Sequence, residues 1–242
     1  LSLCLPSTNS VHGSSFSIIF DHSFSPDLGM FRFADTDLVA RTIDERCTCP
    51  TSHYELLGKL LGKALLDSFA VGVHMAVPFL KNACVSPLTW HDVRHLDAGW
   101  HKSMSDLLAM DPAWIESLCL DFTISYGGTY SSGGGQHVDT GLVELKPGGS
   151  NILVNGENLQ EFITLASQYK LVHRQKRQLG AMLRGLYFVV PEHMLAVFDF
   201  IELELMLGGV PGVDVDDWEA NTEYTLTPQQ QLQQLQKGQE ES

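Results

Sequence analysis

Cysteine and histidine residues are the first candidates for chemistry in this sequence. Cys47 and Cys49 stand two positions apart, and His53 follows closely. His91 and His95 are spaced four apart, as two metal ligands on one helix face would be. A structural zinc site needs four ligands, and neither group is accompanied by a second pair at a usual spacing. We therefore expect no metal site, and interpret the two groups as a loop with ordinary cysteines and a solvated or capping helix face.

Groups typical of nucleophilic, acid–base or phosphate chemistry are also incomplete. Glu202 and Glu204 are two positions apart, so on a helix their carboxylates point to different faces. The segment GGTYSSGGG lacks the Lys-Ser/Thr ending of a phosphate-binding loop, and no G-x-S-x-G nucleophile turn occurs. Cys119 is flanked by two leucines, with no base or positive charge to activate its thiol. The residues alone therefore predict neither a catalytic centre nor a cofactor.

Segment 52–80 opens with the helix around which the chain is organised. Ser52 and Glu55 fit a capping box at its start. Its apolar stripe is formed by Leu57, Leu60, Leu61, Ala64 and Leu65. Gly58 and Gly62 lie on neighbouring turns of one face, and each costs about 1 kcal/mol of helix propensity relative to alanine. Two such costs in one helix indicate that another backbone packs closely against it.

Further helices and strands are predicted from periodicity and capping residues. Helices are expected over 99–110, after Asp111-Pro112, from 159 past 180 in two pieces, over 200–207 and over 215–221. Helix caps are expected at Thr89 with Asp92, at Asp111, and at Asn158 with Glu161. Short strands are expected at 15–20, 118–125, 138–146 and 151–154, and the segment 28–33 is expected to be a turn into a strand. Irregular structure is expected at 34–51 and a Gly/Ser loop at 127–136.

Composition describes a globular, acidic chain. Of its 242 residues 44% are hydrophobic, and the formal net charge is −14, which argues against a nucleic-acid or anionic-membrane surface. No apolar run reaches the roughly 18 residues of a membrane span. The five cysteines are odd in number and irregularly spaced, which favours a reducing intracellular compartment. Because no initiator Met is present, we expect a piece of a longer polypeptide. On these grounds alone the chain is a mixed α/β module.

The order of several segments resembles the catalytic domain of the HECT-type ubiquitin ligases. These segments are YELLGKLLGKALLDS (54–68), PFLK (78–81), TWHDVRHLDAGWHKSMSDLLAMD (89–111), LCLDFTI (118–124), VELKPGGSNILVNGENLQEFITLASQY (143–169) and FIELELMLGGVPGVDVDDWEANTEY (200–224). The resemblance covers about 170 residues and ends near Thr225, where a glutamine-rich stretch follows.

The resemblance implies an α+β, predominantly helical fold, namely the HECT amino-terminal lobe with a large helical and a small α/β subdomain. Residues 52–98 and 173–224 would form the large subdomain, and residues 99–172 the small subdomain that docks the ubiquitin-conjugating enzyme (E2). Residues 1–51 would be an amino-terminal flank with short strands. Residues 225–242 would be a disordered, glutamine-rich tail in place of the hinge and carboxy-terminal lobe.

The family's activity depends on a cysteine in a T-C-F-like setting in the second lobe. That cysteine receives ubiquitin from the conjugating enzyme's thioester and passes it to a substrate lysine. None of the five cysteines has this setting, so we expect the catalytic cysteine to lie outside this chain. The full-length protein is then expected to be a HECT-type ubiquitin-protein transferase, and this chain alone to be inactive. The alternative is a non-catalytic binding module that competes for ubiquitin-conjugating enzymes.

The partners implied by the resemblance are a ubiquitin-conjugating enzyme, ubiquitin and a protein substrate. No cofactor, metal, nucleic acid or membrane span is expected, and the protein would be intracellular, either cytoplasmic or nuclear. The docking positions carried over from the family are Trp100, Ser103, Asp106, Met110, Leu118 and Phe162. Helical spacing places the first four on one side. Trp100, Met110 and Phe162 are alternatively core residues, and only an exposed Phe162 would act as an interface anchor.

Overall fold

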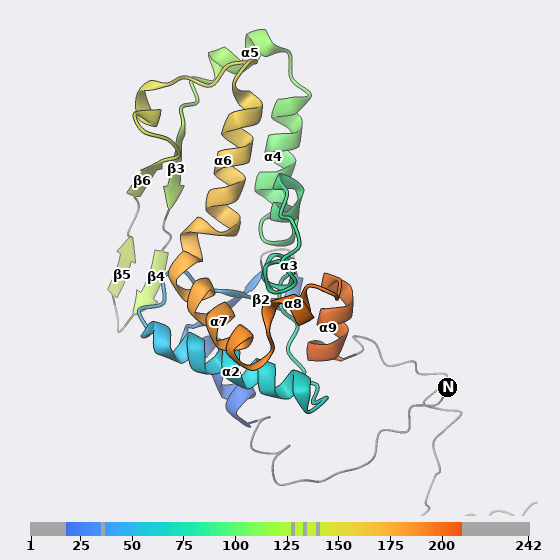
Figure 1. The fold of residues 1–242 in the computed structure, drawn as a ribbon. Coiled ribbons are helices and arrows are strands. Elements are labelled where there is room, and N and C mark those ends of the chain that lie inside the picture. Colours follow the sequence, from blue (N-terminus) through green and yellow to red (C-terminus); the bar gives the residue numbers. More distant parts are fainter. Residues whose placement is uncertain (1–17, 35–36, 127–128, 133–134, 139–140, 210–242) are drawn as a thin grey trace, which may run out of the picture. The chain divides into compact units, whose positions relative to one another are not determined.

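The computed structural model describes residues 18–34, 37–126, 129–132, 135–138 and 141–209. Within these residues the fold is α+β and predominantly helical, as expected (Figure 1). The described strands form three two-stranded antiparallel sheets. Hydrophobic side chains gather in two main cores and a smaller third cluster. The expected helix at 215–221 and the glutamine-rich tail lie outside the described residues.

The first core is built by helices from both ends of the described chain. It is formed by α2 (Thr51–Leu66), α3 (Val77–Ala83), α7 (Lys176–Val189), α8 (Glu192–Leu195) and α9 (Phe200–Gly208), with β1 (Phe31–Ala34) and β2 (Asp37–Ile43) beside them. Tyr54, Leu61 and Leu80 are among its fully buried side chains. The helix expected after Ser52 and the helix ended by Gly208-Gly209 are both confirmed.

Close packing of α2 against α7 explains the two glycines of α2. A Cβ at Gly58 would lie 2.0 Å from the Met182 carbonyl oxygen, and one at Gly62 would lie 2.8 Å from Cβ of Val189. On the other helix, a Cβ at Gly185 would lie 2.0 Å from the Glu55 carbonyl oxygen. The expected approach of a second backbone is therefore confirmed, and α7 supplies it. α9 also contacts α2, without this glycine interlock.

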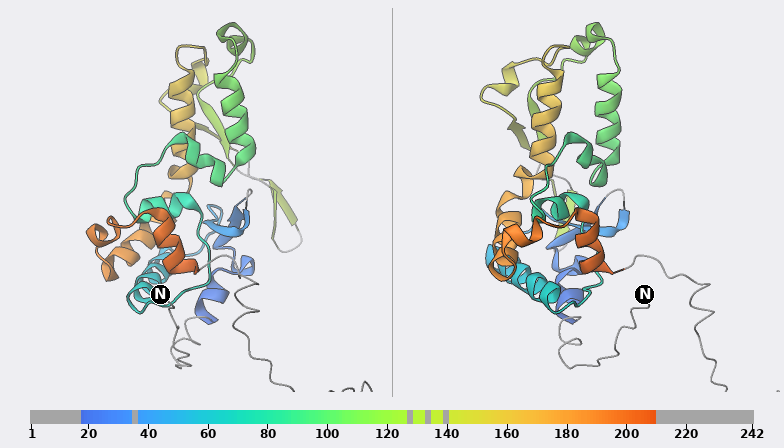
Figure 2. Two further views of the ribbon diagram at one scale, coloured as in Figure 1. Left: turned by 90° about the vertical axis from the view of Figure 1, so that its right-hand side faces the viewer. Right: turned by 45° about the vertical axis from the view of Figure 1, so that its right-hand side comes forward.

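The second core is formed around a pair of neighbouring helices. They are α4 (Ala98–Leu108) and α6 (Leu159–Leu171), which lie side by side in Figures 1 and 2. Smaller elements complete this part of the chain: η2 (Trp90–His95), α5 (Pro112–Ser117), β3 (Thr123–Tyr126), β6 (Gly141–Glu144), η3 (Gly149–Asn151) and η4 (His173–Gln175). β3 and β6 pair from Thr123↔Glu144 to Tyr126↔Gly141. Phe122 and Ile163 are fully buried between the helices and this ribbon.

The strand expected over 118–125 is shorter than its alternating pattern predicted. Leu118 ends α5, and Cys119 follows in a left-handed conformation with φ of 49°. The ladder therefore starts only at Thr123, and residue 121 makes an isolated bridge to Leu153. The expected strand over 151–154 is reduced to that bridge, because Asn151 still belongs to η3. The alternation of apolar and polar residues over 118–125 did not reveal that Leu118 caps α5 and that Cys119 belongs to the turn after it.

Two segments predicted as loops contain strands. The Gly/Ser segment 127–136 contributes β4 (Thr129–Ser132) and the start of β5 (Gly135–Val138), which pair as a hairpin. The polar segment 34–51 contains β2, which forms backbone hydrogen bonds along both of its edges. β1 pairs with one edge, and on the other the Arg41 amide donates to the His74 carbonyl while the Arg41 carbonyl accepts from the Ala76 amide. Partners distant in sequence supply these hydrogen bonds, so local composition did not predict them.

The strand predicted at 15–20 is wrong for its described part, since residues 18–23 are helical. Phe20 and Phe24 are four positions apart and both are buried, so helical spacing directs both rings into the first core. The turn into a strand expected at 28–33 is confirmed, since the chain bends at Gly29 and Met30 and β1 begins at Phe31. The strand expected at 138–146 is confirmed only as β6, with Val138 ending β5 and residues 139–140 outside the described residues.

Helix capping was predicted correctly at some sites and wrongly at others. The Thr89 amide donates to Asp92 at 2.7 Å, and Asp111 accepts from the Ala113 amide at 3.0 Å. In contrast, α2 begins one residue before Ser52, with Pro50 at the cap position and no side-chain cap. The Asn158 side chain accepts from the Asn155 amide instead of capping α6. A loop that turns back on itself thus competes for the asparagine.

Candidate docking surface

The start of α4 is fixed to the end of α6. Asp97 caps α4 by accepting from the Trp100 amide at 2.8 Å, and it also accepts from the Lys170 ammonium at 2.7 Å. Burial alone would raise the pKa of Asp97, but these hydrogen bonds outweigh burial and hold the pKa below its usual value. Lys170 also lies 5.3 Å from the Trp100 ring centroid. These contacts therefore join the start of α4 to the end of α6.

The outward face of α4 carries two of the predicted docking residues. Ser103 and Asp106 are exposed, while Met104 and Leu107 on the opposite face are buried in the second core. The Ser103 hydroxyl donates to the Gly99 carbonyl at 3.0 Å, which leaves its oxygen able to accept a further hydrogen bond. Asp106 and Ser103 therefore form a polar strip along this helix.

Trp100 and Phe162 occupy different surroundings from this strip. Trp100 is half-buried and packs against the second core and the third cluster. Phe162 is only 7% exposed, and its ring meets Phe122 edge-on at a centroid distance of 5.6 Å. The expectation of an exposed aromatic anchor at Phe162 is thus wrong, because the core-facing side of α6 carries this residue. Phe162 supports the surface from beneath.

The turn after α4 and the short helix α5 carry exposed apolar side chains. Met110, Trp114 and Leu118 are spaced four apart and are 37%, 67% and 44% exposed. Ile115 is fully buried and fixes α5 to the second core, so the neighbouring face of this helix points outward. We call Met110, Trp114 and Leu118 the α5 patch. The exposed carboxylates of Asp111 and Glu116 border it.

Trp114 was not among the residues that the sequence reasoning selected. Its signal was present: a tryptophan midway between Met110 and Leu118, in a six-residue helix with room for only one buried face. Tryptophan is enriched among residues that dominate protein interfaces. The structure therefore adds an aromatic residue to the predicted surface, on the short helix between Met110 and Leu118.

The described cysteines do not form a nucleophilic centre. Burial raises the pKa of the Cys84 thiol, and the nearby carboxylates of Asp199 and Glu202 raise it further. Cys119 is exposed and its thiol contacts only the Ser117 carbonyl oxygen, at 3.8 Å. The residues that the structure describes contain no group of three or more potential metal ligands.

The pairs weighed from the sequence have other roles. Glu202 caps α9 by accepting from the Asp199 amide, while Glu204 lies 3.6 Å from His74, so the two carboxylates act separately. His91 contacts His101 at 3.3 Å instead of sharing a ligand with His95. His95 instead accepts from the Arg94 guanidinium.

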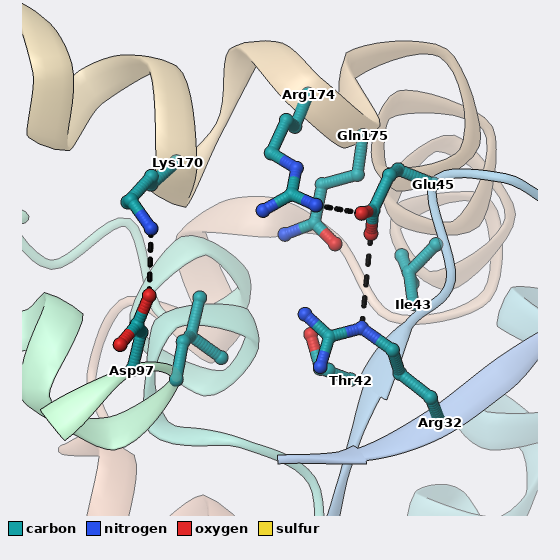
Figure 3. A pocket seen from close by; sticks show the side chains of 9 residues that line it. Arg32, Thr42, Ile43, Glu45, Asp97, Lys170, Arg174 and Gln175 are labelled. Carbon is teal, nitrogen blue, oxygen red and sulfur yellow. Dashed lines mark hydrogen bonds and ion pairs between the residues drawn. The ribbon is translucent and has the colours of Figure 1, made fainter. Parts of the chain in front are cut away.

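A small polar cavity lies where the β1–β2 ribbon, the start of α4 and the end of α6 meet (Figure 3). Glu45 pairs there with Arg174 and, at 3.8 Å, with Arg32, while Lys170 pairs with Asp97. Its volume of about 30 Å³ accommodates a water molecule but no substrate. This cavity is therefore a polar junction between the ribbon of the first core and the helices of the second.

A larger apolar groove of about 430 Å³ lies on the first core. It is lined by residues of α2, α8 and α9 and of the connections after α7 and α8, namely Leu65, Leu66, Val190, His193, Met194, Leu195, Val197, Phe198 and Met206. These elements are separate from α5 and the turn before it, which carry the α5 patch. Exposed apolar residues on the helices of the first core therefore serve as controls for experiments on that patch.

Residues 17–237 match the model of the family described as HECT-domain (ubiquitin-transferase). The chain belongs to this family, the HECT-type ubiquitin ligases.

Individual relatives are similar over most of this chain. It is 31% identical over 218 residues to E3 ubiquitin-protein ligase NEDD4 of Homo sapiens, covering 86% of this chain and 15% of that protein. It is 32% identical over 218 residues to E3 ubiquitin-protein ligase HACE1 of Gallus gallus, covering 87% and 22%. The identity to E3 ubiquitin-protein ligase HUWE1 of Mus musculus is 29% over 212 residues, covering 86% and 5%. The chain thus spans less than a quarter of the length of these relatives.

Among the described helices, none combines the length and the apolar character needed to cross a lipid bilayer.

Proposed function

We propose that this chain is the amino-terminal lobe of a HECT-type ubiquitin-protein transferase and that it docks the ubiquitin-conjugating enzyme. Residues 52–98 and 173–224 would form the large subdomain around the first core, to which Phe20, Phe24 and Phe31 of the flank 1–51 contribute side chains. Residues 99–172 would form the small subdomain around the second core. Family membership supports the ligase role, and the exposed surface of α4 and α5 supports the docking role.

The observation that carries the docking proposal is the α5 patch beside the polar strip of α4. Trp114 and Leu118 expose apolar surface that no described part of the chain covers, on a helix fixed by the buried Ile115. A buried apolar centre with a polar rim is the usual build of a specific protein interface. Ser103 and Asp106 would belong to that rim, and Asp111 and Glu116 favour a partner with basic residues facing them.

Binding measurements with variants of the α5 patch test this proposal. Purified ubiquitin-conjugating enzymes are titrated onto the chain by isothermal calorimetry, and the one that binds is used throughout. Trp114→Ala and Leu118→Ala are each expected to weaken that binding at least tenfold, because truncating an interface anchor costs about 2 kcal/mol or more. Trp114 is mostly exposed, so its variant should unfold at nearly the same temperature as the unmodified chain.

Phe188→Ala is the matched control. Phe188 is 78% exposed on α7 of the first core, and the Lys59 ammonium lies 5.1 Å from the centroid of its ring. Its truncation also removes an exposed aromatic ring, but far along the chain from α5, and should leave the affinity unchanged. Equal affinities for Trp114→Ala, Leu118→Ala and the unmodified chain would contradict docking at the α5 patch.

The transfer chemistry would lie outside this chain. A cysteine thiolate suits the reaction because exchange between thioesters preserves the activated acyl group. Incubation of the chain with a conjugating enzyme charged with ubiquitin is expected to give no ubiquitin adduct that a reducing agent removes. Such an adduct on any cysteine of the chain would contradict this part of the proposal.

A further inference from the structure

Cys47 and Cys49 lie in the connection between the end of β2 and the start of α2. The Cys47 amide donates to the Asp44 carbonyl at 3.1 Å, which turns the chain after the strand. The Cys49 amide then donates to the Cys47 sulfur at 3.4 Å. The Cys47 side chain is therefore folded over the residues that follow it, toward Cys49.

The two cysteines lie next to each other at the edge of the first core. Both side chains are half-buried against that core. A hydrogen bond with Cys47 is the main reason that the pKa of Cys49 is raised, and burial and the charge of Cys47 add to it. Tyr54 of the same core is fully buried, and its hydroxyl donates to the Met30 carbonyl oxygen at 3.2 Å. The contact of 3.4 Å between the Cys49 amide and the Cys47 sulfur thus places the two side chains at one edge of this core.

The other described cysteines have different surroundings. The Cys84 thiol is buried and faces the Asp199 carbonyl oxygen at 3.7 Å, and the Cys119 thiol is exposed near the Ser117 carbonyl oxygen. Each therefore contacts a backbone oxygen, whereas Cys47 and Cys49 contact each other. Two sulfur atoms also fall short of a structural zinc site, which needs four ligands. Oxidation requires only the two that are present.

We propose that Cys47 and Cys49 are a redox modification site that forms a reversible disulfide when the protein meets a peroxide. One thiol attacks the peroxide, the O–O bond breaks, and a sulfenic acid and one water are produced. The second sulfur attacks the sulfenic sulfur, and the hydroxyl group leaves as a second water when it takes up the remaining proton. Two thiols and one hydrogen peroxide thus give one disulfide and two waters. A dithiol reductant reverses the change by thiol–disulfide exchange.

Peptide mapping after mild oxidation tests the proposal. The folded chain is treated with an equimolar amount of hydrogen peroxide, free thiols are blocked with N-ethylmaleimide, and the protein is digested with trypsin. Cleavage after Arg46 and Lys59 releases one peptide that contains both Cys47 and Cys49 and no other cysteine. That peptide is expected to lose both maleimide labels and to be lighter by two hydrogen atoms. Both labels should return when dithiothreitol is added before blocking.

Two variants assign the bond. Cys49→Ser should abolish the disulfide, whereas Cys84→Ser, which removes a cysteine held by a backbone oxygen, should leave its yield unchanged. Retention of both maleimide labels on the 47–59 peptide would overturn the proposal. A bond from Cys47 to Cys4 or Cys119, or oxidation that dithiothreitol does not reverse, would overturn it equally.

Discussion

Substitution of Gly185 by alanine should destabilise the chain although it improves local helix propensity. A Cβ at Gly185 would lie 2.0 Å from the Glu55 carbonyl oxygen and 3.0 Å from the Lys59 amide nitrogen. Favourable contacts of carbon need about 3.5–4 Å, so α2 and α7 would have to separate by roughly 1 Å or more. The obstructing atoms are backbone, which has no alternative rotamer to adopt. The same interlock exists at Gly58, which faces the Met182 carbonyl oxygen.

The expected size of the effect follows from two opposing contributions. Alanine gains about 1 kcal/mol over glycine within a helix. Overpacking a well-packed site costs about 1–3 kcal/mol and occasionally more, and backbone obstruction places Gly185 at the upper end. We therefore expect a net loss of about 2 kcal/mol, which lowers the unfolding temperature by roughly 4–8 °C for a domain of this size.

Gly180→Ala is the matched control because it lies on the same helix without the close contact. The nearest atom to a Cβ there is the end of the Arg184 side chain at 3.6 Å, an ordinary contact distance. This variant should gain up to about 1 kcal/mol from helix propensity. Urea unfolding followed by far-ultraviolet circular dichroism measures both. If Gly185→Ala unfolds at the same urea concentration as Gly180→Ala, the close approach of the two helices is wrong.

Two further predictions concern a core residue and a buried carboxylate. Phe162→Ala should reduce the free energy of unfolding by about 3–5 kcal/mol, as a core truncation does, and a loss below 1 kcal/mol in urea unfolding would contradict its core position. Burial alone would raise the pKa of Asp92, but hydrogen bonds from Lys81 and the Thr89 amide outweigh burial and leave the pKa below its usual value. The folded state therefore gains stability from Asp92 above the unfolded pKa of about 4 and loses it as the pH falls through the folded value. Asp92→Asn should flatten the acid limb of a stability-against-pH curve, and an unchanged limb would contradict this role.

Several elements followed from local sequence signals. The apolar stripe after residue 52 predicted α2, and the glycines on it predicted a close helix neighbour. The Thr89 and Asp111 caps and the glycines that end α9 were likewise predicted. Such signals are local, because a cap or a stripe depends on residues within one or two turns.

Other features depended on partners distant in the sequence. β2 lies in the segment 34–51, which is polar as a whole, and its strand conformation follows from pairing with β1 and from the bridge between Arg41 and Met75. The pattern after Leu118 read as a strand, but the end of α5 and the turn at Cys119 use its first residues. Pairing and competition between elements are tertiary effects that periodicity does not contain.

For the proposed docking surface, the sequence by itself selected candidate positions but did not determine which of their side chains are exposed. Helical spacing placed Ser103 and Asp106 on one face, and the structure leaves both exposed. Only the packing of α6 against Phe122 decided that Phe162 is buried, and only the burial of Ile115 turned Trp114 outward. The same holds for Cys47 and Cys49. Their spacing in the sequence places them near each other, but the turn after Asp44 brings the Cys49 amide against the Cys47 sulfur. Spacing along a chain fixes which residues share a face, whereas the neighbouring elements decide whether that face meets the core or the solvent.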